Sequence, residues 1–325
     1  MNLLIEKIKQ TKNPTVVGLD PKLEYIPDDI RARAFAKLSA EYDAFECAAD
    51  AIFEFNKGLI DALCDIVPAV KPQSAYYEMY GWQGVRTLWR TIEYAKSKGM
   101  YVIADCKRGD IGATSEAYAT AYLGNTIIEG SLKRAFDADS LTVNPYLGSD
   151  GVLPFADVCK DNDKSIFVLV KTSNKSSGEL QDLKAMDNGQ WTMDNDCANS
   201  RGEFELNPKP VYEIMAELVN SWGADSIGEC GYSNVGAVVG ATYPEQAEKL
   251  RKLMPNTYFL VPGYGAQGGT AADVAKSFNA DGLGAIVNAS RSIMCSYMKD
   301  GGDFQSAARA EAIRMRDDIV TAINN

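Results

Sequence analysis

Short apolar runs alternate with segments of helical periodicity along most of the chain. Runs of about four to eight residues that are rich in β-branched and aromatic residues predict buried strands. We expect such strands at about residues 15–19, 67–71, 101–105, 140–144, 166–171, 236–240, 258–261 and 284–288. Between them, apolar side chains recur at the 3.6-residue helical period, as in Phe45, Ala48 and Ile52 or in Ala247 and Leu250. Eight strands separated by helices predict an α/β protein, and favour a closed (β/α)8 TIM barrel over an open sheet.

Two connections between the predicted strands are longer than a minimal crossover. The first, at about residues 21–65, has helical periodicity, whereas the second, at about residues 174–207, is rich in Ser, Asn, Asp and Gly. Neither has the apolar content of a separate domain. We therefore expect a single barrel domain over residues 1–325, with an insertion at about 174–207 on the face where the strands end.

Charged residues gather at the ends of the first three predicted strands. Side chains alternate between the two faces of a strand, so Asp105 and Lys107 should share a face while Cys106 occupies the other. Asp110 follows three residues after Lys107, and two carboxylates around one ammonium would hold that lysine protonated. Asp20 and Lys71 end the first two strands and extend the array. A structural ion pair or a solvated rim would explain one such charge, but five of alternating sign indicate a site.

The last two predicted strands end in residues suited to a phosphate group. The loop at 263–270 (GYGAQGGT) exposes backbone amides, and Arg291 follows the eighth strand with a guanidinium that can bind two phosphate oxygens. Phosphate binding by the loops after strands seven and eight recurs in this fold. Glycines that merely form tight turns are the alternative. We expect a small phosphorylated substrate whose reactive end lies near Lys107.

Composition narrows the chemistry further. The chain has 325 residues, a net charge of −11 and no histidine. The acidic balance argues against nucleic acid as a partner, and the lack of a long apolar stretch argues against a membrane span. Acid–base work must fall to Lys, Asp, Glu, Tyr or Cys, since no histidine triad or histidine metal site can form. Seven scattered cysteines and an N-terminus without a signal-peptide core favour reduced thiols in the cytoplasm.

Together these motifs resemble the orotidine 5′-phosphate decarboxylase family, in particular its longer bacterial type. The resemblance covers nearly the whole barrel in order, through residues 18–21 (GLDP), 71–73 (KPQ), 105–110 (DCKRGD) with Thr114, 142–146 (TVNPY), 262–269 (PGYGAQGG) and 288–291 (NASR). It implies conversion of orotidine 5′-phosphate to UMP and CO2 in pyrimidine biosynthesis, without a cofactor or metal.

The resemblance also implies a role for individual residues. Lys107 would protonate C6 of the pyrimidine, Asp105 would lie beside the substrate carboxylate, and Lys71 would connect the charges to the ribose. Asp110 and Thr114 would reach the neighbouring site of a homodimer. The catalytic residues implied are Lys107, Asp105, Asp110 and Lys71. The substrate-binding residues implied are Asp20, Thr114, Asn144, Ser173, Pro262, Gln267, Gly268, Gly269 and Arg291.

Two other functions fit parts of the pattern. The motif D-x-K-x-x-D also occurs in metal-dependent decarboxylases and aldolases of the same superfamily that act on sugar phosphates. Lys71, Ser173 and the sequence of the phosphate loop count against this alternative. A barrel that binds a phosphorylated ligand without catalysis is the second alternative, and the three charges at Asp105, Lys107 and Asp110 count against it.

Overall fold

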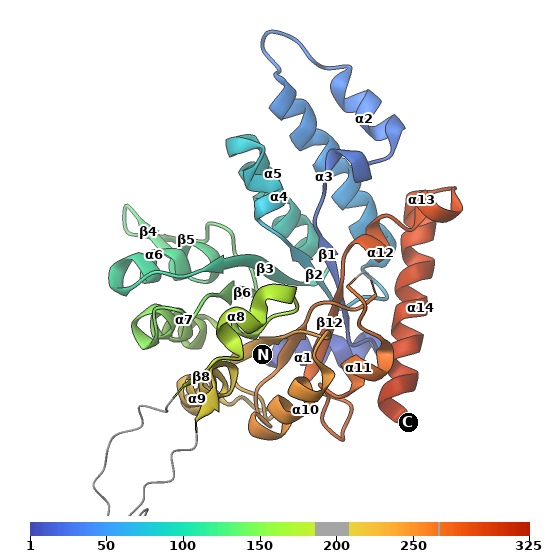
Figure 1. The fold of residues 1–325 in the computed structure, drawn as a ribbon. Helices are drawn as coiled ribbons and strands as arrows, with labels where there is room; N and C mark the ends of the chain where they lie inside the picture. The colour runs from blue at the N-terminus through green and yellow to red at the C-terminus, as the bar shows by residue number, and fades with distance from the viewer. Residues whose placement is uncertain (186–207, 266) are drawn as a thin grey trace, which may run out of the picture.

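The computed structural model describes residues 1–185, 208–265 and 267–325. In this part of the chain, eight parallel strands close into a barrel in the order β1-β12-β11-β10-β7-β6-β3-β2, which confirms the predicted fold (Figure 1). Each strand lies on one of the predicted apolar runs. The barrel strands are β1 (Thr15–Leu19), β2 (Ala69–Pro72), β3 (Tyr101–Arg108), β6 (Ser140–Val143), β7 (Ser165–Lys171), β10 (Val235–Val239), β11 (Phe259–Val261) and β12 (Ala285–Ala289).

Helices follow the strands and surround the barrel (Figure 1). The longer ones are α1 (Asn2–Thr11), α2 (Asp28–Phe35), α3 (Ala44–Leu63), α5 (Gly81–Ser97), α6 (Gly112–Leu123), α7 (Ser149–Asn162), α9 (Val211–Gly223), α10 (Pro244–Leu253) and α14 (Phe304–Asn324). Short helices occupy several loops, namely η1 (Leu23–Tyr25), α4 (Ala75–Glu78), η2 (Lys175–Ser177), α8 (Gly178–Gln181), η4 (Ala224–Ser226), α11 (Ala271–Ala275), α12 (Arg291–Met294) and α13 (Tyr297–Asp300). Two small antiparallel pairs complete the described elements, β4 (Thr126–Ile128) with β5 (Ser131–Lys133) and β8 (Lys184–Ala185) with β9 (Lys209–Pro210).

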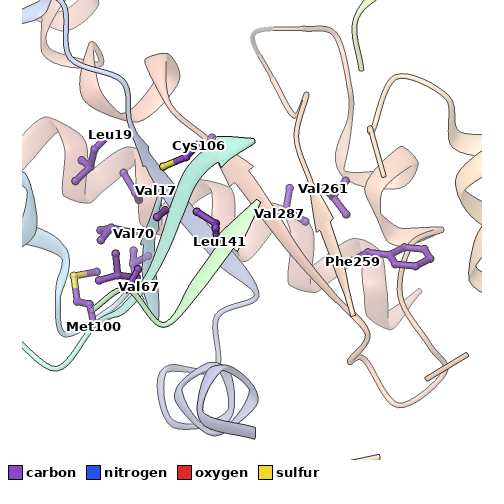
Figure 2. Packing of buried hydrophobic residues seen from close by; sticks show 14 of the residues in the cluster. Val17, Leu19, Val67, Val70, Met100, Cys106, Leu141, Phe259, Val261 and Val287 are labelled. Atoms are coloured by element: carbon purple, nitrogen blue, oxygen red, sulfur yellow. The ribbon is translucent and has the colours of Figure 1, made fainter. Parts of the chain in front are cut away.

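Alternation along the strands divides the apolar side chains into two clusters. Val17 and Leu19 of β1 join the layer between the strands and the helices, part of which Figure 2 shows. Val16 of β1 instead packs inside the barrel with Ile103 and Phe167. Helix α1 packs its buried Leu4, Ile5 and Ile8 onto this interior cluster. The interior is therefore a packed core, and α1 covers it at the end opposite to the carboxyl ends of the strands.

Most of the apolar residues that follow the helical period in α3 are buried, but one is exposed. The Asp43 carboxylate accepts a hydrogen bond from the Glu46 amide and begins the helix. Ala48, Ile52 and Ile60 are buried as their spacing predicts. Phe45 follows the same helical period but is 51% exposed. It lies in the first turn of α3, which extends beyond the barrel next to α2 (Figure 1).

The predicted division of the chain into one domain with an insertion at about 174–207 stays a prediction, because residues 186–207 lie outside the described part. Among the helices that the structure describes, none is long and apolar enough to cross a bilayer.

Gly236 of β10 offers a test of packing inside the barrel. A Cβ atom there would lie 2.7 Å from Cδ1 of Phe167 and 2.8 Å from the Tyr258 carbonyl oxygen. Gly236→Ala should lower the free energy of unfolding by about 1–3 kcal/mol because the interior would be overpacked, and urea unfolding would measure this. Phe167→Leu should cost less in the Gly236→Ala background than alone, since the shorter side chain frees space. Strict additivity of the two changes would show that the residues do not compete for one volume.

Candidate active site

A pocket of about 630 Å³ opens at the ends of the barrel strands. It brings together eight of the predicted site residues, although they come from separate parts of the chain. These are Asp20, Lys71, Asp105, Lys107, Ser173, Pro262, Gln267 and Arg291. The pocket lies at the face where (β/α)8 barrels place their active sites.

The Asp105 carboxylate is the centre of the charge array. Lys71 Nζ lies 2.6 Å from its Oδ2 atom, and Lys107 Nζ lies 2.7 Å from its Oδ1 atom. Thr142 Oγ1 donates a third hydrogen bond to Oδ1 at 2.9 Å. The side chains of Lys71 and Asp105 are 6% and 9% exposed, whereas that of Lys107 is 46% exposed. Lys107 is thus the member of the array that is open to the pocket.

Mutual attraction outweighs the cost of burying these charges. Burial by itself opposes the charged form of Lys71, but Asp105 and Asp20 overcome it and raise the pKa of Lys71 above its ordinary value. Burial likewise opposes the Asp105 carboxylate, yet Lys71 and Lys107 hold the pKa of Asp105 well below its usual range. Both partners of the buried pair are therefore ionised at neutral pH.

Lys107 has an unusual backbone conformation. Its φ of 46° lies in the left-handed region, which costs energy for a residue with a long side chain. The Lys107 amide donates a hydrogen bond to Thr142 Oγ1 at 2.9 Å, and the pairing of β3 with β6 shifts register between Ala104 and Arg108. Thr142 thus binds both the backbone of Lys107 and the carboxylate of Asp105, and holds the two in one arrangement.

The second predicted carboxylate does not pair with Lys107 within the chain. We expected Asp105 and Asp110 to bracket the lysine, but in the described residues one carboxylate, Asp105, is bracketed by two lysines. Asp110 accepts a hydrogen bond from the Ile111 amide. Asp110, Thr114 and Asn144 do not line the pocket. Thr114 and Asn144 are exposed, and Asp110 is half-buried.

The expected phosphate-binding residues divide into two groups. Gln267 and Arg291 line the pocket together with Pro262. Gly268 and Gly269 do not, and their amides donate hydrogen bonds inside the loop, to the carbonyl oxygens of Gly265 and Gly263. In this conformation, side chains rather than those two amides face the space for a phosphate.

Some pocket residues were not among the predicted site residues. Lys22, Tyr76, Thr142, Gln181 and Asn288 also line the cavity. Thr142 and Asn288 belong to the motifs at 142–146 and 288–291. Their positions near strand ends could therefore have predicted that they line the site. Gln181 lies in α8, at the start of the predicted insertion, and no feature of the sequence pointed to it.

Two residues that line the pocket, Asp20 and Asn288, each have an unpaired acceptor atom. Among the described residues, the Asp20 Oδ1 and Asn288 Oδ1 atoms are buried and have no hydrogen-bond partner. Such atoms fit donors on a ligand, for example sugar hydroxyls. No group of three or more Cys, Asp or Glu side chains in residues 1–185, 208–265 and 267–325 is arranged to hold a metal ion.

Comparisons with known proteins identify the relatives of this chain. Residues 17–300 match the family model described as "Orotidine 5′-phosphate decarboxylase / HUMPS family". The orotidine 5′-phosphate decarboxylase of Caldicellulosiruptor bescii is 39% identical over 99% of this chain and 98% of its own length. That of Rhodopirellula baltica is 41% identical over 96% of each chain. The structure of Leishmania donovani OMP decarboxylase aligns with a TM-score of 0.69 at 29% identity, covering 100% of this chain and 98% of the other.

The buried carboxylate gives a prediction about stability and pH. Asp105→Asn should lower the free energy of unfolding by about 3–5 kcal/mol at pH 7, because it leaves the buried Lys71 ammonium without its counter-charge. The folded-state pKa of Asp105 is depressed, so its contribution is present above the unfolded pKa of about 3.9 and is lost as the pH falls through the folded value. The gap between wild type and variant should therefore be about 1 kcal/mol smaller at pH 3 than at pH 7.

Urea unfolding at the two pH values would measure this gap. Asp225→Asn is the matched control, because Asp225 is exposed and should change stability little at either pH. A gap for Asp105→Asn that stays constant or widens on acidification would contradict the prediction.

Proposed function

The chain belongs to the orotidine 5′-phosphate decarboxylase family and decarboxylates orotidine 5′-phosphate to UMP, and we propose that the pocket around Asp105 and Lys107 performs this reaction. The observation that carries the proposal is the contact of one buried carboxylate with two ammonium groups, one of them open to the pocket. The metal-dependent alternative gains no support from these relatives. They align with this chain over nearly their full length, and both are named orotidine 5′-phosphate decarboxylase.

In the proposed step, the bond between C6 of the pyrimidine and its carboxylate breaks. CO2 departs, and the electron pair stays on C6 as a carbanion that the ring delocalises poorly. The Lys107 ammonium would stabilise this charge and then transfer a proton to C6. The neutral amine regains its proton from solvent. A cation that is already fixed in place acts strongly on a developing anion because it needs no reorganisation.

Asp105 has two tasks in this proposal. Its hydrogen bonds to Lys71 and Lys107 fix both ammonium groups in place. Its negative charge would also lie beside the substrate carboxylate and repel it, and this repulsion would disappear as CO2 leaves. Lys71 keeps Asp105 ionised for the second task, because it pairs with the carboxylate oxygen that Lys107 does not contact.

Residues around the rim would hold the rest of the substrate. We assign Asp20 and Lys71 to the ribose hydroxyls, Ser173 to the pyrimidine ring, and Gln267 and Arg291 to the 5′-phosphate. Arg291 is exposed at the start of α12, so its guanidinium is accessible to an anion. Binding energy from the distant phosphate can be used to lower the barrier at C6. The predicted substrate contacts of Pro262, Gly268 and Gly269 stay part of this proposal.

We assign Asp110, Thr114 and Asn144 to the interface of a homodimer. Asp110 and Asn144 lie on the β3–α6 and β6–α7 connections and Thr114 lies in the first turn of α6, all outside the pocket of their own chain. Large apolar side chains on the same connections and on α7 are exposed, namely Ile111 (53%), Tyr146 (78%), Leu147 (51%) and Leu153 (40%). An apolar patch of this kind is typical of a protein–protein interface. A second copy would bury it and bring Asp110 toward the neighbouring Lys107.

The expected location is the cytoplasm. The six described cysteines, including the buried Cys47, Cys106 and Cys159, are free thiols, which agrees with a reducing compartment.

Replacing the proposed proton donor tests the mechanism. Lys107→Ala should lower kcat by about 10³-fold or more, since both charge stabilisation and proton transfer are lost. UMP should still bind within about 10-fold of wild type, because most contacts to the nucleotide are unchanged. A spectrophotometric assay of orotidine 5′-phosphate and calorimetry with UMP would measure the two quantities. Lys299→Ala, an exposed lysine outside the pocket, is the control, and near-normal turnover by Lys107→Ala would reject the mechanism.

Mixed dimers test whether Asp110 acts across the interface. Lys107→Ala and Asp110→Ala should each be nearly inactive alone. In a mixed dimer, the subunit with Asp110→Ala keeps its own Lys107 and receives Asp110 from its partner, so one site is complete. Co-refolding equal amounts should restore about a quarter of the wild-type activity, because half of the dimers are mixed and each has one complete site.

Lys107→Ala mixed with Lys71→Ala is the matched control. Both of these residues line the pocket of their own chain, so no mixed dimer has a complete site and activity should not return. Failure of the Lys107→Ala and Asp110→Ala pair to recover activity would overturn the proposed role of the interface.

A further inference from the structure

The loop that follows β7 is held by a short helix from the beginning of the predicted insertion. This loop contains Thr172, Ser173 and Asn174, and all three line the pocket. Helix α8 starts only a few residues later and places Gln181 against the same cavity. The function proposed above uses only Ser173 from this region.

Gln181 binds Thr172, the residue before Ser173, through both the oxygen and the nitrogen of its side-chain amide. Its Oε1 atom accepts a hydrogen bond from the Thr172 amide at 3.0 Å, and its Nε2 atom donates to Thr172 Oγ1 at 2.8 Å. Two bonds from one planar group fix the orientation of Thr172 more firmly than either bond alone. The backbone that leads into Ser173 is therefore fixed by a side chain from α8.

An ion pair between a buried ammonium and a partly exposed carboxylate anchors α8 to the barrel wall. The pairing of β7 with β10 shifts register between Val238 and Val239, and Lys171 pairs with Val239 after this irregularity. Lys171 is fully buried and its Nζ atom lies 2.7 Å from Asp182 Oδ1, in the residue that follows Gln181. The ammonium also lies 4.5 Å from the ring centre of Tyr243 and 5.7 Å from that of Tyr212. A buried ammonium that lost its carboxylate would be costly, so Asp182 holds α8 in place.

The other side of Ser173 is equally constrained. A Cβ atom on Gly240 would lie 2.8 Å from the Ser173 amide nitrogen and 2.8 Å from its Cα atom, so the two backbones are in close contact. Thr242 Oγ1 donates a hydrogen bond to the Ser173 carbonyl oxygen at 3.1 Å. With this side fixed by β10 and its following loop, α8 supplies the remaining constraint on Ser173.

We infer that Gln181 is a positioning residue for the decarboxylation, and that Asp182 supports it through Lys171. Gln181 and Asp182 together hold Ser173 in the position where its hydroxyl group contacts the pyrimidine ring. This inference rests on the proposed function, which assigns Ser173 to that ring. It also gives the first part of the predicted insertion a role in the reaction.

Gln181→Ala should lower kcat/KM about 10-fold to 100-fold, because a small displacement of a substrate-contacting group has effects of this size. It should change the same kinetic parameter, kcat or KM, as Ser173→Ala does. Gln181→Glu keeps the oxygen that accepts from the Thr172 amide but loses the donor to Thr172 Oγ1, so it should retain part of the activity. Glu179→Ala is the control, since Glu179 is exposed on the same helix and should leave kcat/KM unchanged.

A double-mutant cycle separates positioning from a merely structural role. In the Ser173→Ala background, Gln181→Ala should have little further effect on kcat/KM, because the group that it positions is gone. Urea unfolding should show that Gln181→Ala is folded and close to wild type in stability. Asp182→Asn, which keeps an oxygen for the Lys171 ammonium, is a second variant that should act in the same direction with a smaller effect.

The outcomes distinguish this inference from the proposed function. If Ser173→Ala lowers kcat/KM but Gln181→Ala has no effect, or an equal effect in both backgrounds, the inference is overturned while the proposed function stands. If Ser173→Ala leaves kcat/KM unchanged, the assignment of Ser173 fails and the inference fails with it.

Discussion

The arrangement of the site depends on the contact of the Asp105 carboxylate with two ammonium groups. One carboxylate contacts the two positive charges of Lys71 and Lys107, of which the second is 46% exposed at the pocket. Asp20 balances part of this charge from the side of Lys71, whose pKa it helps to raise. Among the described residues of its own chain, Lys107 is thus left with Asp105 as its one carboxylate partner. A cation in this state attracts an anionic substrate and is suited to a negative charge that develops during the reaction.

This arrangement is built where the barrel is least regular. The register of β3 against β6 shifts between Ala104 and Arg108, the stretch that contains Lys107, and that of β7 against β10 shifts just before Lys171. Lys107 also has a φ of 46°. Such features cost stability and persist only where the surroundings determine them fully. Here the closed ladder of strands supplies that support, and Thr142 binds both the amide of Lys107 and the carboxylate of Asp105.

The sequence was sufficient to predict the barrel because its signals are local. Strand alternation correctly separated Cys106, which is in the outer layer, from Asp105 and Lys107 at the pocket. It could not predict the orientation of Lys171. Simple alternation would align Lys171 with Phe167 inside the barrel, but an irregular pairing reverses its side and places it between aromatic rings. The prediction that Asp110 contacts Lys107 is also wrong within the chain. Spacing along a strand does not determine the path of the loop that follows. Gln181 was missed for the same reason, since its contact with Thr172 depends on how that loop folds back.

The acidic character of the chain does not conflict with an anionic substrate. The net charge of −11 is a sum over the whole chain, and exposed charges are screened over about 8–10 Å at physiological salt. The substrate instead experiences the groups that line its pocket, which lie well within this screening distance. Lys71, Lys107 and Arg291 come from three separate strand ends and converge on one cavity. The barrel thus produces a cationic site in an acidic protein, because its topology brings together residues that are far apart in sequence. Local convergence, and not overall charge, decides which ligands this protein can bind.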